Sequence, residues 1–428
     1  MGSNFFSTCE PDVRLKALMT IPYGNGMMWV VQDWDQRRTI RVHAPTRAGR
    51  DFDFETFAKY VDDLPADTML VTVADDFSMV SSSSDFTEDG TQVPVYPSLA
   101  ADFPPAAAAT VRRRDLVEVD RLGVMVDLVT YQPSPAQASK RAAFKYFINV
   151  GNRVNFWHEM NCMLRMPPHP NIVPMEALVL ETVDGDDKVV GFLTRYIPGE
   201  TLHQNKDRVF KLKYLEQLLD AVDFLNLRCG IVHGDICPWN LLIDAETDSL
   251  QLFDFNSGAK LGWEGDDETW FCYEEDRNDV KFVVFTLYEI ITRAYEFSFR
   301  GEFYPHELDA ATVLKKRTWR KHADTQLDHP VTVYRRVLAA WLAKRKGTDR
   351  TVRHFSQAAE PLDWPPVPGG PTYTERGGMN DWAGQYRAGL VMAGKDVVRW
   401  ERPATRALPL ADGQRLLATG EVVPDPTA

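Results

Sequence analysis

The sequence predicts an α+β fold in which a strand-rich half is followed by a helix-rich half. Two observations support this prediction. Between residues 115 and 199 the apolar residues fall in short, β-branched runs separated by turns, whereas after Gly199 they recur at intervals of three and four. The chain has 428 residues, 44% of them hydrophobic, which is enough for two or three domains with their own cores.

The regions outside these two halves carry weaker signals. Residues 1–77 contain strand-like runs such as MMWVVQDW and MLVTVADDF and a helix expected after Asp53, which predicts a small accessory region. Residues 78–114 are rich in Ser, Pro and Ala, a composition typical of a linker. Residues 361–428 are expected to form a C-terminal tail with one helix, at 381–392.

Residues 115–199 are expected to form one compact unit of five strands and a helix. The strand-like runs are LVEVDRL, VMVDLVTY, AAFKYFINV, EALVLETV and VVGFLTRYI. The helix is expected between Asn155 and Arg165. A turn signal, Asp-Gly-Asp-Asp from Asp184, separates the last two strands.

Residues 200–360 are expected to be mainly helical. Leucine and valine recur from Leu212 to Leu225 on one face of an amphipathic helix, and Gly230 is placed to end it. A second apolar run, which begins at Val280, predicts another helix. This run is too short to cross a bilayer.

Charge and cysteine content exclude several classes of function. The formal net charge is -13, from 61 acidic and 48 basic residues, so binding to nucleic acid or to an anionic membrane is not expected. The five cysteines show no CxxC spacing, and the N-terminus lacks a secretion signal. These features favour reduced thiols in the cytoplasm, with the nucleus as the alternative compartment.

Polar residues surround an expected β-hairpin near the middle of the chain. Leu241–Ile243 and Leu250–Phe253 are apolar runs joined by the turn residues DAETDS, so antiparallel pairing brings Asn240 and Asp254 together at the open end. Opposite residues there lie roughly 5 Å apart at Cα, and their oxygen atoms can share one Mg²⁺ ion. Asp235 begins the loop that leads into the hairpin, where its carboxylate can accept a proton from an attacking hydroxyl group.

This pattern, His233-x-Asp235-x₄-Asn240 followed by Asp254-Phe255, resembles the catalytic loop and metal-binding motif of the protein kinase superfamily. The resemblance covers both predicted halves, which together make up more than half of the chain. It implies a bilobal kinase-like fold, with a strand-rich N-lobe at 115–199 and a helical C-lobe at 200–360. It also implies ATP and Mg²⁺ as cofactors.

The resemblance implies a role for each residue of the motif. Asp235 is expected to be the catalytic base, and Asn240 and Asp254 the metal ligands. His233 is expected to support the loop rather than carry a proton. Asp279 is expected to anchor the backbone of the catalytic loop, although an Asp here also suits the N-cap of the helix that follows.

The strand-rich half contributes the remaining expected site residues. Lys145 takes the position of the family's phosphate-orienting lysine, and its alternative is a protective Lys on an edge strand. Glu159 is the expected partner of Lys145, and its alternative is a solvated surface residue. Gly123 lies in the expected phosphate-covering loop, and Thr194 and Tyr196 lie in the expected adenine-binding hinge.

Several positions depart from the family pattern. Gly123 is the only glycine of the phosphate-covering loop, and Asn256 replaces the glycine that follows Asp-Phe. Cys237 replaces the lysine that stabilises the transferring phosphoryl group in serine/threonine kinases, and a small buried filler is the preferred interpretation. Gly234 replaces an arginine that binds an activation-loop phosphate, so no activation by phosphorylation of Thr269 is expected.

These features favour an ATP- and Mg²⁺-dependent phosphotransferase that acts on protein hydroxyl groups, with ATP and a protein substrate as partners. The missing glycines and the absence of a clear A-P-E motif favour an alternative, a pseudokinase that serves as a scaffold or a nucleotide-binding regulatory module. The His-Gly-Asp form also resembles small-molecule phosphotransferases, which is the second alternative.

Overall fold

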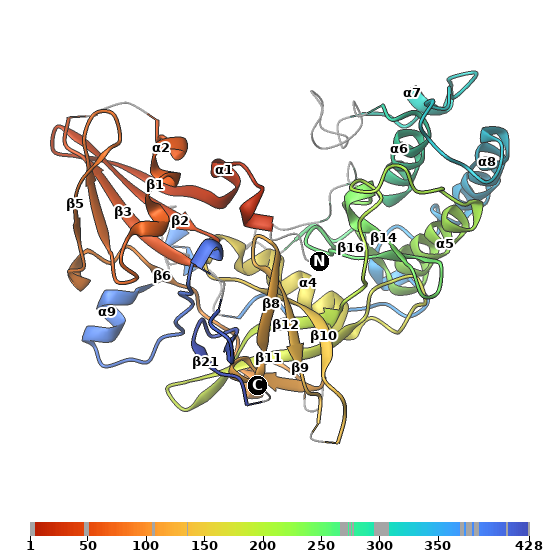
Figure 1. Cartoon of the computed structure of the whole chain (residues 1–428). Helices are drawn as coiled ribbons and strands as arrows, with labels where there is room; N and C mark the ends of the chain where they lie inside the picture. The colour runs from red at the N-terminus through yellow and green to blue at the C-terminus, as the bar shows by residue number, and fades with distance from the viewer. Residues whose placement is uncertain are drawn as a thin grey trace. The chain divides into compact units, whose positions relative to one another are not determined.

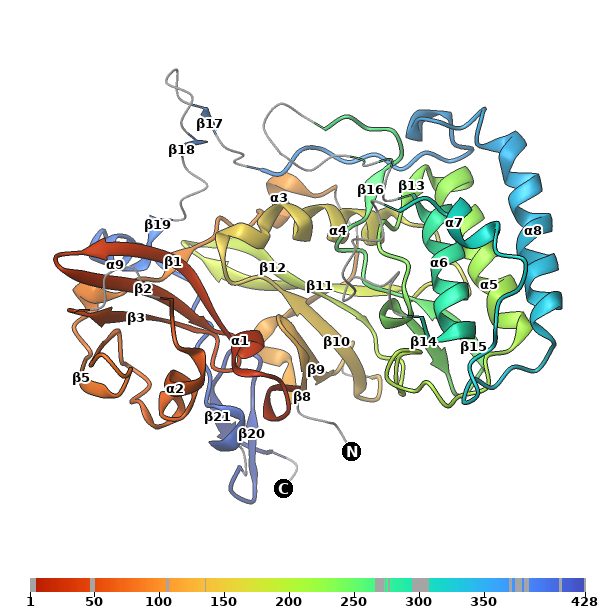
Figure 2. The same cartoon turned by 90° about the horizontal axis from the view of Figure 1, so that it is seen from above.

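A computed structural model of the whole chain is shown in Figure 1 and, from above, in Figure 2. The structure describes residues 5–46, 51–104, 108–134, 136–265, 273, 275, 278–294, 308–368, 372–373, 379–380, 385–407 and 410–426. It divides into two compact units, and each is described by itself. Unit 1 comprises Met1–Arg153, Glu176–Tyr196 and Tyr373–Ala428, and unit 2 comprises Val154–Met175 and Ile197–Thr372.

A five-stranded sheet forms the N-terminal part of unit 1, with its strands in chain order. They are β1 (Leu15–Tyr23), β2 (Gly26–Asp33), β3 (Arg38–Ala44), β4 (Leu70–Val73) and β5 (Met79–Ser83). Neighbours run antiparallel except β3 and β4, which are parallel and are connected through α2 (Phe54–Ala58). Asp53 caps α2 by accepting a hydrogen bond from the Thr56 N–H at 2.9 Å. The core of this sheet includes the fully buried Phe57 and Phe77.

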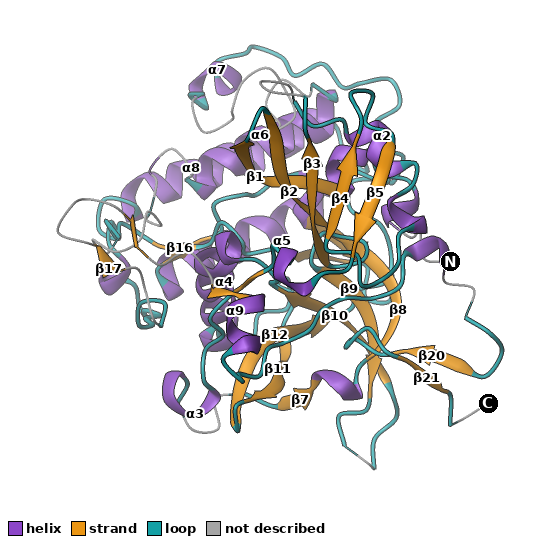
Figure 3. Ribbon diagram, turned by 90° about the vertical axis from the view of Figure 1, so that its left-hand side faces the viewer, coloured by secondary structure: helices purple, strands orange, loops and turns teal. Residues whose placement is uncertain are grey.

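A six-stranded sheet forms the second part of unit 1, and its strands are orange in Figure 3. They are β7 (Thr110–Arg112), β8 (Val117–Gly123), β9 (Val126–Tyr131), β10 (Lys140–Tyr146), β11 (Met175–Val183) and β12 (Asp186–Arg195). Their order in the sheet is β7-β11-β12-β10-β9-β8. Strand β10 is therefore an interior strand, paired with β12 on one side and β9 on the other.

The segments expected to be a linker and a tail both contribute elements to unit 1. The linker segment contains β5, β6 (Gln92–Val93), α3 (Leu99–Asp102) and β7. The tail segment contains β17 (Thr372–Tyr373), β18 (Met379–Asn380), β19 (Gln385–Tyr386), α9 (Arg387–Met392), β20 (Gln414–Leu416) and β21 (Val422–Pro424). Strand β7 pairs with β11, and β19 pairs with β6. Of the helix expected at 381–392, α9 is present, and residues 381–384 lie outside the described residues.

The tail also covers one face of the six-stranded sheet. Trp400 stacks on Tyr146 of β10, with ring centroids 4.9 Å apart and an interplanar angle of 17°. It lies beside Phe144 of the same strand, at a centroid distance of 6.4 Å. Because side chains alternate along a strand, this is the face opposite to Lys145.

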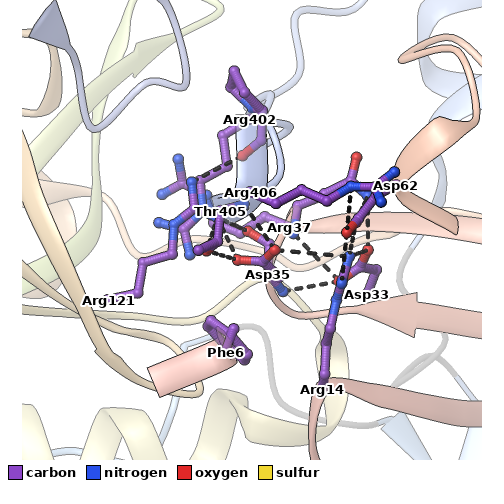
Figure 4. Close-up of polar contacts among 12 residues, drawn as sticks. Phe6, Arg14, Asp33, Asp35, Arg37, Asp62, Arg121, Arg402, Thr405 and Arg406 are labelled. Carbon is purple, nitrogen blue, oxygen red and sulfur yellow. Dashed lines mark hydrogen bonds and ion pairs between the residues drawn. The ribbon is translucent and has the colours of Figure 1, made fainter. Parts of the chain in front are cut away.

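Three arginines and three acids from distant parts of the chain meet in the interior of unit 1. They are Arg37, Arg121, Arg402, Asp35, Glu118 and Asp127, and no side chain among them is more than 4% exposed. Arg402 donates to Glu118 at 2.7 Å and to Asp127 at 2.8 Å. Figure 4 shows Arg121 and Thr405 beside Asp35, whose carboxylate accepts a hydrogen bond from the Thr405 N–H at 2.9 Å. We call this group the buried ion cluster, and its equal numbers of opposite charges satisfy the requirement that buried charges be paired.

Burial and the neighbouring arginines shift the pKa values of the acids in this cluster in opposite directions. Burial opposes ionisation of Glu118, but the neighbouring guanidinium groups, Arg402 first, outweigh it and lower the pKa of Glu118 to about 2. Burial raises the pKa of Asp127 and outweighs the attraction of Arg402. The N-terminal sheet, the six-stranded sheet and the tail are therefore connected by charges that depend on one another.

Unit 2 is mainly helical. Its principal helices are α4 (Arg153–Arg165), α5 (Leu212–Asp223), the π-helical turn η6 (Phe224–Cys229), α6 (Asp279–Thr292), α7 (Ala311–Leu314) and α8 (Val331–Thr348). Its strands form two pairs. Strand β13 (Ile231–Val232) pairs with β16 (Ala259–Lys260), and β14 (Leu241–Asp244) pairs with β15 (Ser249–Leu252). Helices α5, α6 and α8 pack against one another (Figure 2). Helix α5 continues through η6 to Gly230, whose φ of +70° ends it as the sequence predicts.

The expected α+β class is confirmed. The five strand-like runs between 115 and 199 are β8, β9, β10, β11 and β12, and the helix expected at 155–165 is α4. None of the helices within the described residues is long and apolar enough to span a membrane. The domain boundaries expected from the sequence remain a prediction.

Candidate active site

The β14–β15 hairpin carries the two expected metal ligands. Leu241 pairs with Leu252, so the residue directly opposite Asn240 is Phe253, whose N–H donates to the Asn240 carbonyl at 3.2 Å. Asp254 lies one residue further along the chain, so the direct opposition of Asn240 and Asp254 expected from the sequence is displaced by one position. The φ of Asp254 is +68°, a left-handed conformation that Asp adopts more readily than most residues.

Asn240 contacts the expected catalytic base directly. Its Nδ2 group donates to the Asp235 carboxylate at 2.9 Å and to the Asp235 carbonyl at 2.8 Å. Asn240 is buried. Because the Nδ2 side of the amide faces Asp235, the Oδ1 side is directed away from it and can serve as an oxygen ligand. One amide group can therefore hold the base and bind a cation at the same time.

The backbone of the catalytic loop is held from α6 by Asp279, which is fully buried. One oxygen of its carboxylate accepts hydrogen bonds from the His233 N–H at 2.9 Å and from Asn226 Nδ2 at 2.8 Å. The other oxygen accepts a hydrogen bond from the Gly234 N–H at 2.9 Å. The N-cap of α6 is Asn278, so Asp279 serves the loop and not the helix end.

His233 connects the loop to the residues around Asp254. Its Nε2 lies 2.9 Å from the Phe253 carbonyl, and its ring lies 4.7 Å from the ring centroid of Phe255. Its Nδ1 accepts a hydrogen bond from the Asp235 N–H at 3.3 Å, which places the proton on Nε2. Both ring nitrogens are engaged with backbone groups, as a supporting role requires.

Gly234 has a steric reason to be glycine. Its φ is +74°, and a Cβ atom there would lie 2.5 Å from the Ser257 carbonyl oxygen. No larger residue fits without moving the backbone, so the arginine of the family pattern is excluded by the path of the chain after Asp254. Asn256, which replaces the glycine of the family pattern, does not adopt a left-handed conformation, whereas Asp254 does. Thr269 lies outside the described residues.

Glu159 on α4 reaches the turn that follows the hairpin. Its Oε1 accepts a hydrogen bond from the Phe255 N–H at 3.1 Å, and the residue is 3% exposed. This burial excludes the alternative of a solvated surface residue. The turn at Asp254 and Phe255 is thus held by a carboxylate from α4 in addition to the ring of His233.

The remaining expected residues lie in unit 1. Lys145 is on the interior strand β10, between Val126 and Phe192 of the neighbouring strands, which excludes the edge-strand alternative. Gly123 ends β8 at the β8–β9 hairpin. Thr194 is buried in β12, and Tyr196 follows the end of that strand. Their expected contacts with a nucleotide, and that of Lys145 with Glu159, remain predictions.

Cys237 is half-buried in the catalytic loop. Burial, followed by the nearby carboxylate of Asp235, raises the pKa of its thiol well above the ordinary value. The thiol is therefore neutral near pH 7. It can neither replace the charge of the family's lysine nor act as a thiolate.

Sequence reasoning missed two residues of α6 that face the loop. The Thr286 hydroxyl donates to the Ile236 carbonyl at 2.8 Å. Glu289 lines a pocket together with Pro238 and Lys206, and burial raises its pKa to about 7 although Lys206 opposes the shift. The available signal in the sequence was an acid near the end of the mostly apolar run that begins at Val280.

The sequence of this loop and hairpin lies in a segment that matches a known family. Residues 129–275 match the protein kinase domain family. One similar protein is the CBL-interacting serine/threonine-protein kinase 16 of Arabidopsis thaliana, 38% identical over 109 residues, which cover 24% of this chain and 22% of that protein. Another is the serine/threonine-protein kinase RIM11/MSD1 of Saccharomyces cerevisiae, 30% identical over 108 residues, which cover 23% of this chain and 29% of that protein.

The loop that carries Asp235 and the β14–β15 hairpin both lie within the matched segment. The chain contains a domain of the protein kinase superfamily. The matched segments span less than a third of the length of either relative.

Proposed function

We propose that the chain is an ATP- and Mg²⁺-dependent phosphotransferase that phosphorylates hydroxyl groups of proteins. The observation that supports this most directly is the 2.9 Å hydrogen bond between Asn240 and the carboxylate of Asp235. It holds an oxygen ligand for a cation next to a general base. The match of residues 129–275 to the protein kinase domain family supports the same class of reaction.

The proposed reaction assigns roles to Asp235, His233 and Asp279. The substrate hydroxyl oxygen forms a bond to the γ-phosphorus of ATP, the bond from that phosphorus to the β-phosphate bridging oxygen breaks, and ADP leaves. Asp235 orients the hydroxyl group and accepts its proton. Asp279 and His233 keep the loop backbone fixed while the proton moves.

The donor set of the site fits a magnesium ion. Asn240 Oδ1 and the carboxylate of Asp254 are hard oxygen ligands, and Mg²⁺ takes its other ligands from phosphates and water. When bound, the ion neutralises the charge that develops on the phosphate oxygens.

Unit 1 is proposed to bind the nucleotide. Lys145 contacts the phosphates, and Glu159 fixes that lysine. Gly123 lies over the phosphates, and Thr194 and Tyr196 flank the adenine. Because Cys237 is neutral where the family has a lysine, we expect transfer to be about 10²- to 10³-fold slower than in an enzyme that keeps this charge.

The test is transfer from labelled ATP with Mg²⁺ or Mn²⁺ to the protein itself, to generic proteins or to small alcohols. We expect Asp235→Asn to abolish transfer while ATP still raises the melting temperature. We expect Asp254→Ala to abolish the Mg²⁺-dependent part of that rise. Asp244→Ala is the matched control, because Asp244 is a buried acid at the other end of β14.

A binding role without transfer is the second candidate. It is favoured by Gly123, the single glycine of the β8–β9 hairpin, and by the neutral Cys237. ATP binding without transfer to any acceptor would support this scaffold or regulatory role. Transfer only to small alcohols would instead identify a small-molecule phosphotransferase, and no response to ATP would contradict the kinase proposal.

We place the protein in the cytoplasm, with the nucleus as the alternative. The four cysteines within the described residues, Cys9, Cys162, Cys229 and Cys237, are all free thiols. Reduced thiols in this number are typical of those compartments. Fractionation of cells that produce the full chain would test this assignment.

A further inference from the structure

The segment that follows α8 in unit 2 is held by backbone hydrogen bonds along most of its length. We call residues 355–367 the strap. The Phe355 N–H donates to the Leu261 carbonyl at 2.7 Å, next to β16. Further along, three strap N–H groups donate to consecutive carbonyls of η6: Ala359 to Leu227 (3.2 Å), Glu360 to Arg228 (2.7 Å) and Leu362 to Cys229 (2.9 Å). The strap is therefore a fixed part of unit 2.

Two glycines allow this close approach. Gly230 has a φ of +70°, and a Cβ atom there would lie 2.7 Å from the Phe355 carbonyl oxygen. Gly262 has a φ of +66°, and a Cβ atom there would lie 2.1 Å from the Arg353 carbonyl oxygen. Neither position tolerates a side chain, so the sequence is adapted to the path of the strap.

The strap then reaches α4 at the two residues that precede Glu159. Trp157 Nε1 donates to the Pro365 carbonyl at 2.9 Å, and Trp364 Nε1 donates to His158 Nδ1 at 2.9 Å. Trp157, His158 and Trp364 are each 4% exposed or less. Because these side chains are buried, loss of either hydrogen bond leaves a buried polar group without its partner, which costs free energy. The strap thus fixes the segment of α4 that carries Glu159.

Trp364 also fixes the start of the segment that follows Asp254. Lys260 Nζ in β16 donates to the Trp364 carbonyl at 3.0 Å and forms an ion pair with Asp363. The same ammonium group lies 5.0 Å from the ring centroids of both Trp263 and Trp364. One residue of the strap therefore contacts α4 through its side chain and β16 through its carbonyl group.

We propose that Trp364 is a positioning residue for phosphoryl transfer, which ties α4 to β16 and so keeps Glu159 on the turn that holds Asp254. This inference rests on the proposed function and adds a residue that positions the site for it. The path of contacts runs from Trp364 to His158, along the helix to Glu159, and from its carboxylate to the Phe255 N–H at 3.1 Å. Asp254 is the residue before Phe255.

The charge state of His158 agrees with its role as an acceptor. Burial, and then the positive charge of Lys260, lower the pKa of His158 to about 3. The ring is therefore neutral near pH 7, and its Nδ1 can accept the hydrogen bond from Trp364. Cations and acids that face it from neighbouring elements are Lys260 of β16 and Asp363 of the strap.

The strap also explains how β16, in the segment after Asp254, is held in a chain that lacks the arginine of the catalytic loop. Gly234 offers no cation for an activation-loop phosphate, whereas Lys260 pairs with the carboxylate of Asp363 in the strap. The contacts that Trp364 and Asp363 make with α4 and β16 involve no modified residue, and we call them the brace.

The test compares Trp364→Phe with Trp341→Phe in the full chain. Both variants keep an aromatic ring and lose one buried N–H donor, since Trp341 Nε1 donates to Asp223 at 2.9 Å, away from α4. We expect Trp364→Phe to lower kcat about tenfold at nearly constant KM for ATP, the size of one buried hydrogen bond. Trp341→Phe should leave kcat within about twofold, whatever its effect on melting temperature.

Variants of His158 separate positioning from stability. In His158→Asn the amide oxygen can take the place of Nδ1, so we expect most of kcat to return, whereas His158→Leu should behave like Trp364→Phe. The double variant of His158→Leu with Trp364→Phe should lose no more than either alone, because both remove the same bond. An equal kcat for His158→Asn and His158→Leu would overturn the proposal.

Hydrogen exchange distinguishes failure of this inference from failure of the proposed function. Trp364→Phe should raise exchange of backbone amides in both α4 and β16, and Trp341→Phe should not. If the wild type transfers no phosphate, the proposed function fails, and exchange alone decides whether the strap fixes α4. Unchanged exchange in α4 together with unchanged kcat would show that Trp364 only fills space.

Discussion

The carboxylate of Asp279 accepts a hydrogen bond from the backbone N–H of His233 at 2.9 Å. The two residues are far apart in the sequence, and this bond connects the first turn of α6 to the catalytic loop. Asp279 is fully buried and has both oxygens occupied. The three hydrogen-bond donors to this carboxylate are the backbone N–H groups of His233 and Gly234 and the side-chain amide of Asn226, so the position of the loop depends on Asp279.

We expect Asp279→Asn to lower the free energy of unfolding by about 2–4 kcal/mol. The amide has one acceptor oxygen where the carboxylate has two, so the N–H of His233 or of Gly234 is left without an acceptor in a dry environment. Thermal and urea denaturation measure this cost. Asn278→Ala is the control, because it removes the helix cap, worth about 1 kcal/mol, and a hydrogen bond to Tyr273 without touching the catalytic loop. Equal effects of both substitutions would contradict the anchoring role.

A second prediction concerns the buried ion cluster. Arg402→Met leaves Glu118 and Asp127 without their closest cation, and breaking a buried ion pair in this way costs about 3–5 kcal/mol. Hydrogen exchange of β8 and β9 should show the loss. Arg406→Met is the control, because Arg406 is half-exposed and pairs with Asp62 and Asp63, which both lie outside the buried ion cluster, so we expect a smaller loss of stability.

A compensating variant makes this prediction sharper. Because burial already raises the pKa of Asp127, this acid tolerates loss of its charge. Asp127→Asn should therefore restore part of the stability that Arg402→Met removes, although neither substitution adds a contact. A double variant less stable than Arg402→Met alone would show that the cluster is held by shape and not by charge.

The elements of residues 115–230 were predictable because their signals are local. Alternating β-branched runs and the leucine spacing from Leu212 are properties of short windows, and each maps onto one strand or helix of the structure. The same is true of the loop, where spacing alone places Asp235 near Asn240. The hairpin register was missed by one residue because both runs are apolar over several positions, and apolarity alone does not fix which residues face each other.

The docking of the outer regions could not be predicted from local pattern. Arg37 donates to the Ala418 carbonyl and Arg402 to Asp127, and nothing in the sequence near these residues indicates the pairing. The Ser- and Pro-rich composition of residues 78–114 also conceals β7, which is only Thr110–Arg112 and depends on β11 for its hydrogen bonds. Trp364 carries no motif either, and its importance follows only from what it contacts.

A third prediction concerns activation. We expect Thr269→Glu to change the transfer rate by less than about twofold. Gly234 provides no cation for a negative charge in this segment, and Lys260 is already paired with Asp363. Rates measured with labelled ATP for Thr269→Glu and the control Thr269→Ala should be alike. A strong increase in the transfer rate for Thr269→Glu, without one for Thr269→Ala, would contradict the role of the brace.

The last prediction concerns Glu289. Burial raises the pKa of its carboxyl group to about 7. In the unfolded chain the pKa of a glutamate is about 4.3, so between these values the native state binds more protons than the unfolded state. Stability therefore falls as the pH rises from about 4.3 to about 7, by about 4 kcal/mol in total for this group, and above pH 7 the titration of Glu289 no longer changes it.

Glu289→Gln should remove this dependence, because glutamine has nearly the same shape and stays neutral. We expect the variant to unfold at a higher temperature than the wild type at pH 8, and at a similar temperature at pH 4.5, when melting curves are recorded at both. Glu360→Gln, at an exposed surface pair with Arg228, is the matched control and should leave the slope unchanged. A wild-type slope that persists in Glu289→Gln would show that another group titrates in this window.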